Sequence, residues 1–306
     1  VSIIYWASRL RAAEAEILRD TVPAWALPFL LTVWLGERGQ ISQPAYEDFL
    51  ASGTAHILAV SGVHVGLVFL SAQFLLGSFL KSPRLRAMLI LLIVISFALA
   101  AGARVSSLRA AAMVALYVGA DLLRRERDAP TALAVAAIAL LFVNPMSLFD
   151  PGFLLSFSSV ASLLLFVPAL QHLLPEDADW KRYVAPPLAV QVLPTPLALN
   201  QFHVLPLLSP LVNLAVIPLL TGVLWLTFLT VVLGTLSTGV GSIFGHAAGV
   251  LVGVISLIAR WAAQMPGSHA LVSSPSGTGL FFYYLSAACL LVGCIQKGRG
   301  RRLAPV

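Results

Sequence analysis

The sequence has very few charged residues. Only 10% of its 306 residues are Asp, Glu, Lys or Arg, whereas 59% are hydrophobic, and the mean hydropathy is +0.92. A soluble globular domain carries about 25% charged residues. The composition therefore excludes a soluble domain and indicates a polytopic membrane protein. With spans of about 20 residues each, the length allows roughly eight to ten crossings.

The sequence also lacks the residue patterns of common enzymes and cofactor sites. Its two cysteines, Cys289 and Cys294, stand five apart in one apolar segment, which is a poor spacing for a disulfide on one helix. There is no Cys/His metal pattern, no H-E-x-x-H, no G-x-S-x-G and no G-x-x-x-x-G-K-[ST] in the chain. We therefore expect no enzymatic activity, no metal and no cofactor, and energy for any transport must come from elsewhere.

Hydrophobic runs predict an all-α bundle of about nine transmembrane helices, some of them short, broken or re-entrant. Residues 1–20 predict an amphipathic helix at the membrane surface, and residues 21–306 predict one polytopic transmembrane domain. Val22–Leu35 is too short to cross and predicts a half-spanning element. Because the chain starts at Val1, we interpret it as a fragment of a longer protein. The nine spans are Ala55–Leu80, Ala87–Ala101, Ser107–Leu123, Thr131–Val143, Ser147–Leu170, Tyr183–Gln201, Leu207–Leu233, Gly241–Gln264 and Leu280–Ile295.

Positive charge is concentrated in a few connections. The formal net charge is +6. Cytoplasmic loops of membrane proteins are rich in Lys and Arg. Nine alternating crossings place all the basic connections on one side, and the connections around Ala103, Asn144, His203 and Ser268 on the other. The basic connections are 81–86, 124–127, 181–182 and the tail from Lys297.

The stretch from Thr54 to Gly66 places polar and small residues in an apolar segment. Gly62 and Gly66 stand four apart, which predicts close helix packing. Ser61 and His64 share another face. His56 and His64 are eight apart and do not form a metal-binding face. We expect these histidines to be hydrogen-bonded between helices or to line a lumen.

Further polar residues lie at the ends of other predicted spans. Arg104 precedes a predicted helix start, which suits either an anion site or contact with lipid headgroups. Arg109 lies within a span and needs a partner or water. Asp150 precedes a proline and is expected to cap the next helix. It also offers a pairing partner to either arginine.

The segment from Phe202 to Pro218 combines an aromatic residue, polar residues and several prolines. Phe202 either stacks on a nucleobase or packs at the membrane interface. His203 is placed on the outer side by the charge pattern. The prolines predict a bent helix, in which Asn213 or Ser209 satisfies freed backbone groups.

Four blocks in this order resemble the ComEC-type competence proteins, the DNA-uptake channels of transformable bacteria. They are His56–Gly66 (HILAVSGVHVG), Gly102–Ala110 (GARVSSLRA), Asp150–Phe157 (DPGFLLSF) and Phe202–Pro218 (FHVLPLLSPLVNLAVIP). The resemblance implies that the chain moves single-stranded DNA across the bacterial cytoplasmic (inner) membrane. The candidate path residues are then His56, Ser61, His64, Arg104, Arg109, Asp150, Phe202, His203 and Asn213.

The resemblance also implies partners beyond membrane lipid and DNA. These are a periplasmic DNA receptor, a cytosolic helicase-like ATPase, and OB-like and metallo-β-lactamase-like domains of the same longer chain. Neither domain is encoded here, so any nuclease activity would lie outside this sequence. Two alternatives stay open on the residues alone: a secondary transporter for a small solute, and a membrane anchor for the missing soluble domains.

Overall fold

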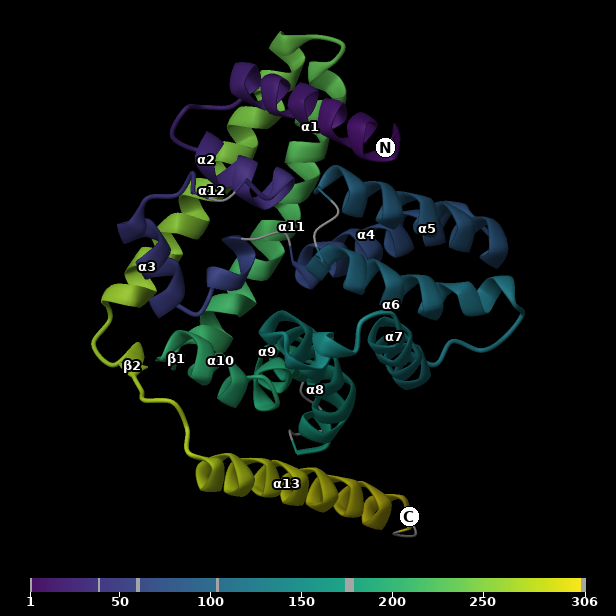
Figure 1. Ribbon diagram of the computed structural model, residues 1–306, viewed down its shortest axis with the longest axis vertical. Coiled ribbons are helices and arrows are strands. Elements are labelled where there is room, and N and C mark those ends of the chain that lie inside the picture. The colour runs from purple at the N-terminus through teal and green to yellow at the C-terminus, as the bar shows by residue number, and fades with distance from the viewer. Residues whose placement is uncertain (1, 38, 59–60, 103–104, 174–178, 304–306) are drawn as a thin grey trace.

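The computed structural model describes residues 2–37, 39–58, 61–102, 105–173 and 179–303, and most of them are helical (Figure 1). A single pair of short antiparallel strands, β1 and β2, is the only sheet among the described residues. The helices are α1 (Ser2–Thr21), α2 (Leu27–Leu30), η1 (Leu31–Leu35), α3 (Gln43–Ala51), η2 (Ala55–Leu58), α4 (Gly62–Phe79), α5 (Pro83–Ala100), α6 (Val105–Leu122), α7 (Ala129–Val143), η3 (Pro145–Phe149), α8 (Pro151–Leu173), α9 (Lys181–Val192), α10 (Thr195–Phe202), α11 (Ser209–Gly234), α12 (Thr238–Gln264) and α13 (Gly277–Leu303); β1 is Val204–Pro206 and β2 is His269–Leu271.

Seven of the described helices are long and apolar enough to cross a membrane: α4, α5, α6, α8, α11, α12 and α13. The all-α, multi-pass character predicted from the sequence is therefore confirmed. Two of the nine predicted spans are not among these seven helices. Thr131–Val143 corresponds to α7, an apolar helix of only 15 residues. Tyr183–Gln201 is not one span, because the chain breaks between α9 and α10.

Prolines cause the break between α9 and α10, and neighbouring helices provide hydrogen bonds to the backbone groups at the break. Pro194 and Pro196 lack the amide hydrogens that a continuous helix needs. The Ser162 hydroxyl on α8 donates to the Ala189 carbonyl (2.5 Å) and accepts from the Leu193 amide (3.1 Å). From α13, the hydroxyls of Tyr283 and Tyr284 donate to the carbonyls of Val192 and Leu193. Irregular backbone is tolerated within a membrane domain when its polar groups are bonded in this way.

The prediction of one continuous helix over Ala55–Leu80 is also wrong. The described part of this stretch consists of the short turn η2 and of α4, which starts only at Gly62. Residues 59 and 60 lie outside the described residues. Ser61 has an extended backbone (φ −123°, ψ 175°) and therefore precedes α4 as its N-cap.

The N-terminal helix α1 lies across the ends of α11 and α12 (Figure 1). It buries Ala15 and Leu18, while Arg9 and Arg19 on its other side are exposed. This two-sided character agrees with the predicted amphipathic helix, and its position at the membrane surface stays a prediction. The following segment, α2 with η1, is buried from Phe29 to Leu35 and forms part of the main core.

Close helix packing depends on glycines of α12 rather than of α4. Gly241, Gly245 and Gly249 repeat every four residues; Gly241 faces the backbone of Gly234 on α11, and the other two face the chain that leaves α1. A Cβ atom on Gly245 would collide with the carbonyl oxygen of Thr21. At Gly62 an added Cβ would make only an ordinary contact, 3.5 Å from Ala110, and at Gly66 no described atom lies within 4 Å. The prediction of close packing is therefore wrong for Gly66. At Gly62 the structure shows an ordinary contact and not a close backbone approach.

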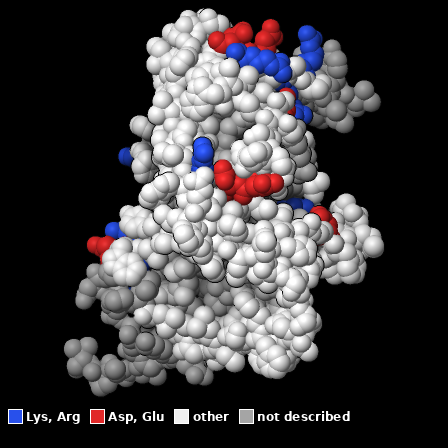
Figure 2. All heavy atoms as spheres, turned by 90° about the vertical axis from the view of Figure 1, so that its left-hand side faces the viewer, with Lys and Arg blue, Asp and Glu red and all other residues white. Residues whose placement is uncertain are grey.

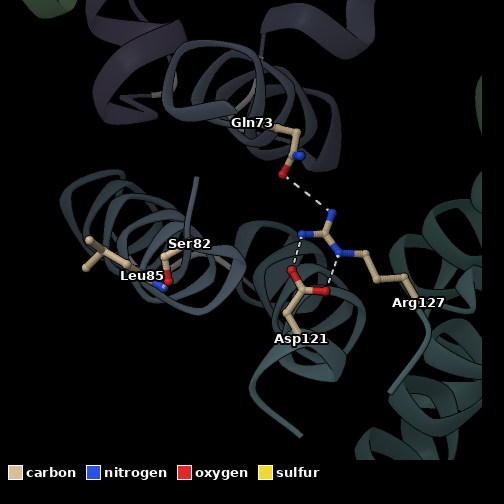
Figure 3. A network of polar contacts seen from close by, with 5 residues as sticks. All are labelled: Gln73, Ser82, Leu85, Asp121 and Arg127. Carbon is tan, nitrogen blue, oxygen red and sulfur yellow. Dashed lines mark hydrogen bonds and ion pairs between the residues drawn. The ribbon is translucent and has the colours of Figure 1, made fainter. Parts of the chain in front are cut away.

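Helices α4, α5 and α6 pack side by side, and their basic connections lie at one end (Figure 1). At that end the Arg127 guanidinium binds the Asp121 carboxylate with two hydrogen bonds and donates to the side-chain oxygen Oε1 of Gln73 (3.4 Å), as Figure 3 shows. Arg127 also lies over the Tyr117 ring, 5.3 Å from its centroid. These contacts connect the ends of α4 and α6.

Strand pairing brings together two of the connections that the charge pattern placed on one side. Val204 pairs with Leu271, and Pro206 pairs with His269. The connection after His203 and the connection at Ser268 therefore share one end of the α11–α12 hairpin, as the sequence predicted.

Candidate functional site

The start of α4 holds a buried histidine and its capping serine. The Nδ1 atom of His64 accepts from the backbone amide of Ser61 (3.3 Å) and lies 3.2 Å from its hydroxyl. The side chain of His64 is fully buried, and its Nε2 atom has no hydrogen-bond partner among the described residues. The pair thus shapes the N-terminus of α4 and leaves one polar atom of the imidazole unused.

His56 lies in η2, close enough to His64 for the two rings to interact electrostatically. Its side chain is exposed, but protein atoms lie around it. They reduce its hydration, and this lowers the pKa of His56 below the usual value. A contact with the backbone of Gly53 opposes that shift. The lowered pKa favours the uncharged imidazole of His56 near neutral pH.

Gly53 connects η2 to the start of α11. Its φ of +76° and its position against Ser209 and Pro206 leave no room for a side chain. The Ser209 hydroxyl donates to the Gly53 carbonyl (3.4 Å) and accepts from the side-chain amides of Asn213 (3.0 Å) and Gln191 (3.2 Å). Asn213 is buried, and its Oδ1 atom has no described partner. Asn213 thus bonds to the Ser209 side chain rather than to a backbone group of its own helix, and Ser209 bonds the backbone of Gly53 in another segment. Neither described bond goes to a group that proline frees within α11, which corrects the prediction.

A second polar cluster joins α6 to α8. Nη1 of Arg109 lies 3.3 Å from Oδ2 of Asp150, and its Nη2 donates to the Ser156 hydroxyl (3.1 Å). Arg109 is buried, whereas the Asp150 side chain is 48% exposed. Asp150 also accepts from the Gly152 amide (3.0 Å) at the start of α8. Both expected roles of Asp150, capping and pairing with Arg109, are therefore present.

Most of the predicted path residues form one connected series. Hydrogen bonds run from Gln191 and Asn213 through Ser209 to Gly53, whose backbone interacts with His56, and His56 lies near His64. Gly62, two residues before His64, faces Ala110, the neighbour of Arg109. The series thus includes residues of η2, α4, α6, α8, α9 and α11, and the bond from Ser209 to Gly53 spans 156 residues of sequence.

Three predicted residues lie apart from this series or outside the description. His203 has a left-handed backbone (φ 56°) and lies with its Nε2 3.1 Å from the Ser274 hydroxyl. Phe202 is exposed beside it, and both interpretations of its ring stay predictions. Arg104 lies outside the described residues.

Sequence reasoning missed Gln191 and Ser162, which lie in or beside the segment interpreted as an unbroken span. The signal that could have found them is the proline density from Pro186 to Pro196. Proline frees backbone groups, and polar side chains near such a break are candidates to bond them. Among the described residues, no three His, Cys, Asp or Glu side chains lie close enough to share a metal ion.

Comparison with known proteins gives relatives along almost the whole chain. ComE operon protein 3 of Bacillus subtilis (strain 168) is 26% identical over 289 residues, which cover 94% of this chain and 37% of that protein. Competence protein ComA of Neisseria gonorrhoeae is 26% identical over 310 residues, or 98% and 42% of the two chains. Recombination protein 2 of Haemophilus influenzae is 26% identical over 173 residues, or 52% and 21%.

The chain thus spans less than half the length of these relatives. No solved structure matches it significantly. The family model described as "Competence protein" matches residues 33–297, which include the connected polar series and all seven long apolar helices. This chain therefore belongs to the Competence protein family.

Proposed function

We propose that this chain forms the membrane channel through which one strand of DNA crosses the cytoplasmic membrane during natural transformation. The observation that carries the proposal is the family match over residues 33–297. The relatives named for competence and recombination align with this chain over a minor part of their own length, so the proposal concerns the membrane domain that they share with it.

The polar series supports transport of a hydrated or charged cargo. Nε2 of His64, Oδ1 of Asn213 and Nε of Arg109 are buried and have no described hydrogen-bond partner. Leaving such groups unbonded in a membrane domain is costly. A path that admits water or a polar polymer would satisfy them, which a purely structural anchor would not need.

We assign the other steps of DNA uptake to other proteins or domains. We infer that a periplasmic DNA receptor delivers the strand and that a cytosolic helicase-like ATPase draws it inward. We also infer that the full-length protein carries OB-like and metallo-β-lactamase-like domains, and that any nuclease chemistry lies in the latter. On this view the present chain binds and conducts DNA without catalysing a reaction.

Uptake of labelled DNA by a transformable host tests the proposal. The host's gene for the full-length protein is deleted and then restored as wild type, Asn213→Leu or His64→Leu. We expect the deletion to abolish entry of nuclease-protected single-stranded DNA and the wild-type gene to restore it. The two variants should restore the protein level but not uptake, because a leucine removes the polar group from the proposed path.

Phe74→Leu is the matched control, since Phe74 is exposed on α4 away from the polar series. It should restore uptake fully. Normal DNA entry in the deletion strain would contradict the channel. Loss of uptake of a small solute, with DNA entry unchanged, would instead favour the secondary transporter.

A further inference from the structure

A recess of about 560 Å³ lies between α3 and α12, apart from the polar series described above. One wall is formed by the first turns of α3, including Glu47 and Asp48. The other wall carries Ser256, Arg260 and Gln264, which repeat every four residues and so share one face of α12. On the face of the molecule that carries these helices, acidic and basic side chains lie near each other in a mostly uncharged surface (Figure 2).

The opposite charges in this recess do not neutralise each other directly. Among the described residues, neither Glu47 nor Asp48 forms an ion pair with Arg260. Glu47 accepts instead from the Gln43 side-chain amide (2.9 Å). The recess thus presents a guanidinium on one wall and two carboxylates on the other, with space between them. Such a site suits a ligand that carries both an anionic and a cationic group.

The surroundings of the recess are those of a membrane-embedded surface. Arg260 and Gln264 lie in the last turns of α12, a helix long enough to cross the membrane. Beside them, exposed apolar side chains continue along α12. They are Val250, Val254, Leu257 and Trp261. Trp261 on α12 and Tyr46 on α3 are both exposed near the recess, and Trp and Tyr are enriched where membranes meet water.

We propose that this recess binds the headgroup of a phospholipid that carries a phosphate and a primary ammonium, as phosphatidylethanolamine does. Arg260 binds the phosphate through its guanidinium, and Glu47 and Asp48 accept hydrogen bonds from the ammonium. The acyl chains lie along the exposed apolar residues of α12. The site would tie α3, which leads into the polar series through Gly53, to lipid at that end of α12.

Binding of short-chain lipids to the purified full-length protein in detergent tests this site. Dioctanoyl phosphatidylethanolamine, phosphatidylcholine and phosphatidylglycerol are titrated separately, and tryptophan fluorescence reports binding. We expect phosphatidylethanolamine to bind about tenfold more tightly than phosphatidylcholine, whose quaternary ammonium has no hydrogen to donate. Phosphatidylglycerol should bind most weakly, because it is anionic and meets two carboxylates. Inorganic phosphate should not compete at equal concentration, since it lacks both the ammonium and the chains.

Variants separate the two halves of the site. Arg260→Gln should weaken binding of phosphatidylethanolamine and phosphatidylcholine alike, by about tenfold. The double variant Glu47→Gln, Asp48→Asn should remove the preference for phosphatidylethanolamine and leave phosphatidylcholine binding unchanged. Arg125→Gln and Glu126→Gln, exposed in another connection, are the matched controls and should change neither. Equal affinity for the three lipids, tightest binding of phosphatidylglycerol, wild-type affinity in Arg260→Gln, or wild-type selectivity in the double variant would overturn the proposal.

Discussion

Arg109 on α6 and Asp150 at the start of α8 form an ion pair of 3.3 Å in which only the carboxylate reaches solvent. The pair joins two segments that are 41 residues apart in the sequence, and the same carboxylate caps α8 through the Gly152 amide. The two functions can be separated, because an asparagine side chain also caps a helix but carries no charge.

Asp150→Asn should therefore lower stability by removing the ion pair while it keeps the cap. The buried Arg109 would then retain only its bond to Ser156, and we expect a loss of about 1–3 kcal/mol, moderated by the exposure of Asp150. Thermal unfolding in detergent measures the effect. In a double-mutant cycle with Arg109→Gln, the coupling energy should exceed about 0.5 kcal/mol. Strictly additive effects would contradict an energetically significant pair.

Ser162→Ala should destabilise the break between α9 and α10. It removes the hydroxyl that donates to Ala189 and accepts from the Leu193 amide, at a fully buried position. We expect a cost of about 1–3 kcal/mol in thermal unfolding and faster hydrogen exchange at the Leu193 amide. Ser158→Ala is the control, because that hydroxyl bonds only to a carbonyl of its own helix. Equal effects of the two substitutions would show that Ser162 does not support the break.

Gly245→Ala and Gly66→Ala should have opposite effects although both glycines lie inside long apolar helices. A methyl group at Gly245 meets the Thr21 carbonyl, and the forced separation should cost about 1–3 kcal/mol. A methyl group at Gly66 meets no described atom and should be neutral or stabilise by up to about 1 kcal/mol. Protein yield and the unfolding temperature compare the two. A stable Gly245→Ala protein would show that α1 and α12 do not pack this closely.

Glu14→Gln should stabilise the protein at neutral pH. Glu14 is buried on α1, where desolvation raises its pKa above the ordinary value of 4.5, against the smaller effects of the Trp34 hydrogen bond and of Arg11. The folded state then binds more protons than the unfolded state, so stability falls as pH rises through the raised pKa. Glutamine keeps an acceptor for the Trp34 Nε1 hydrogen and has no charge to bury.

The difference in unfolding temperature between Glu14→Gln and wild type should therefore be largest near pH 7 and shrink towards pH 4. Glu16→Gln, at an exposed position of the same helix, is the control. A difference that is independent of pH would mean that the Glu14 carboxylate is not destabilised by burial.

Arg104→Gln tests whether the arginine before α6 binds a DNA phosphate. If it does, affinity for single-stranded DNA should fall similarly for every sequence. The log–log salt dependence should decrease by roughly 0.7. An arginine that contacts only lipid headgroups would change stability or insertion and leave the salt slope unchanged. Titrations of the purified protein at several salt concentrations distinguish the two outcomes, and parallel slopes would contradict the phosphate contact.

The sequence by itself determined the class of the protein and most of its long helices. A chain with little charge and long apolar runs is expected to form membrane helices, because the backbone polar groups of each span must be hydrogen-bonded within that span. The four family-like blocks were also visible as polar and small residues in apolar surroundings. The capping role of Asp150 could be predicted because it depends only on the residues next to it.

Tertiary structure decided what depends on neighbours distant in the sequence. The segments Ala55–Leu80 and Tyr183–Gln201 have the composition of single spans, yet neither is one continuous helix. In the first, α4 begins only after its N-cap Ser61. In the second, Ser162, Tyr283 and Tyr284 donate hydrogen bonds to the backbone at the break. Gly66 and Gly245 sit in similar glycine repeats, but only one of them faces another backbone. Likewise, the position of Arg109 inside a span was enough to predict that it needs a partner. Only the packing of α6 against α8 decided that this partner is Asp150. Local propensity sets where a helix can form, and the bonds made across the fold decide where it stops and which polar groups meet.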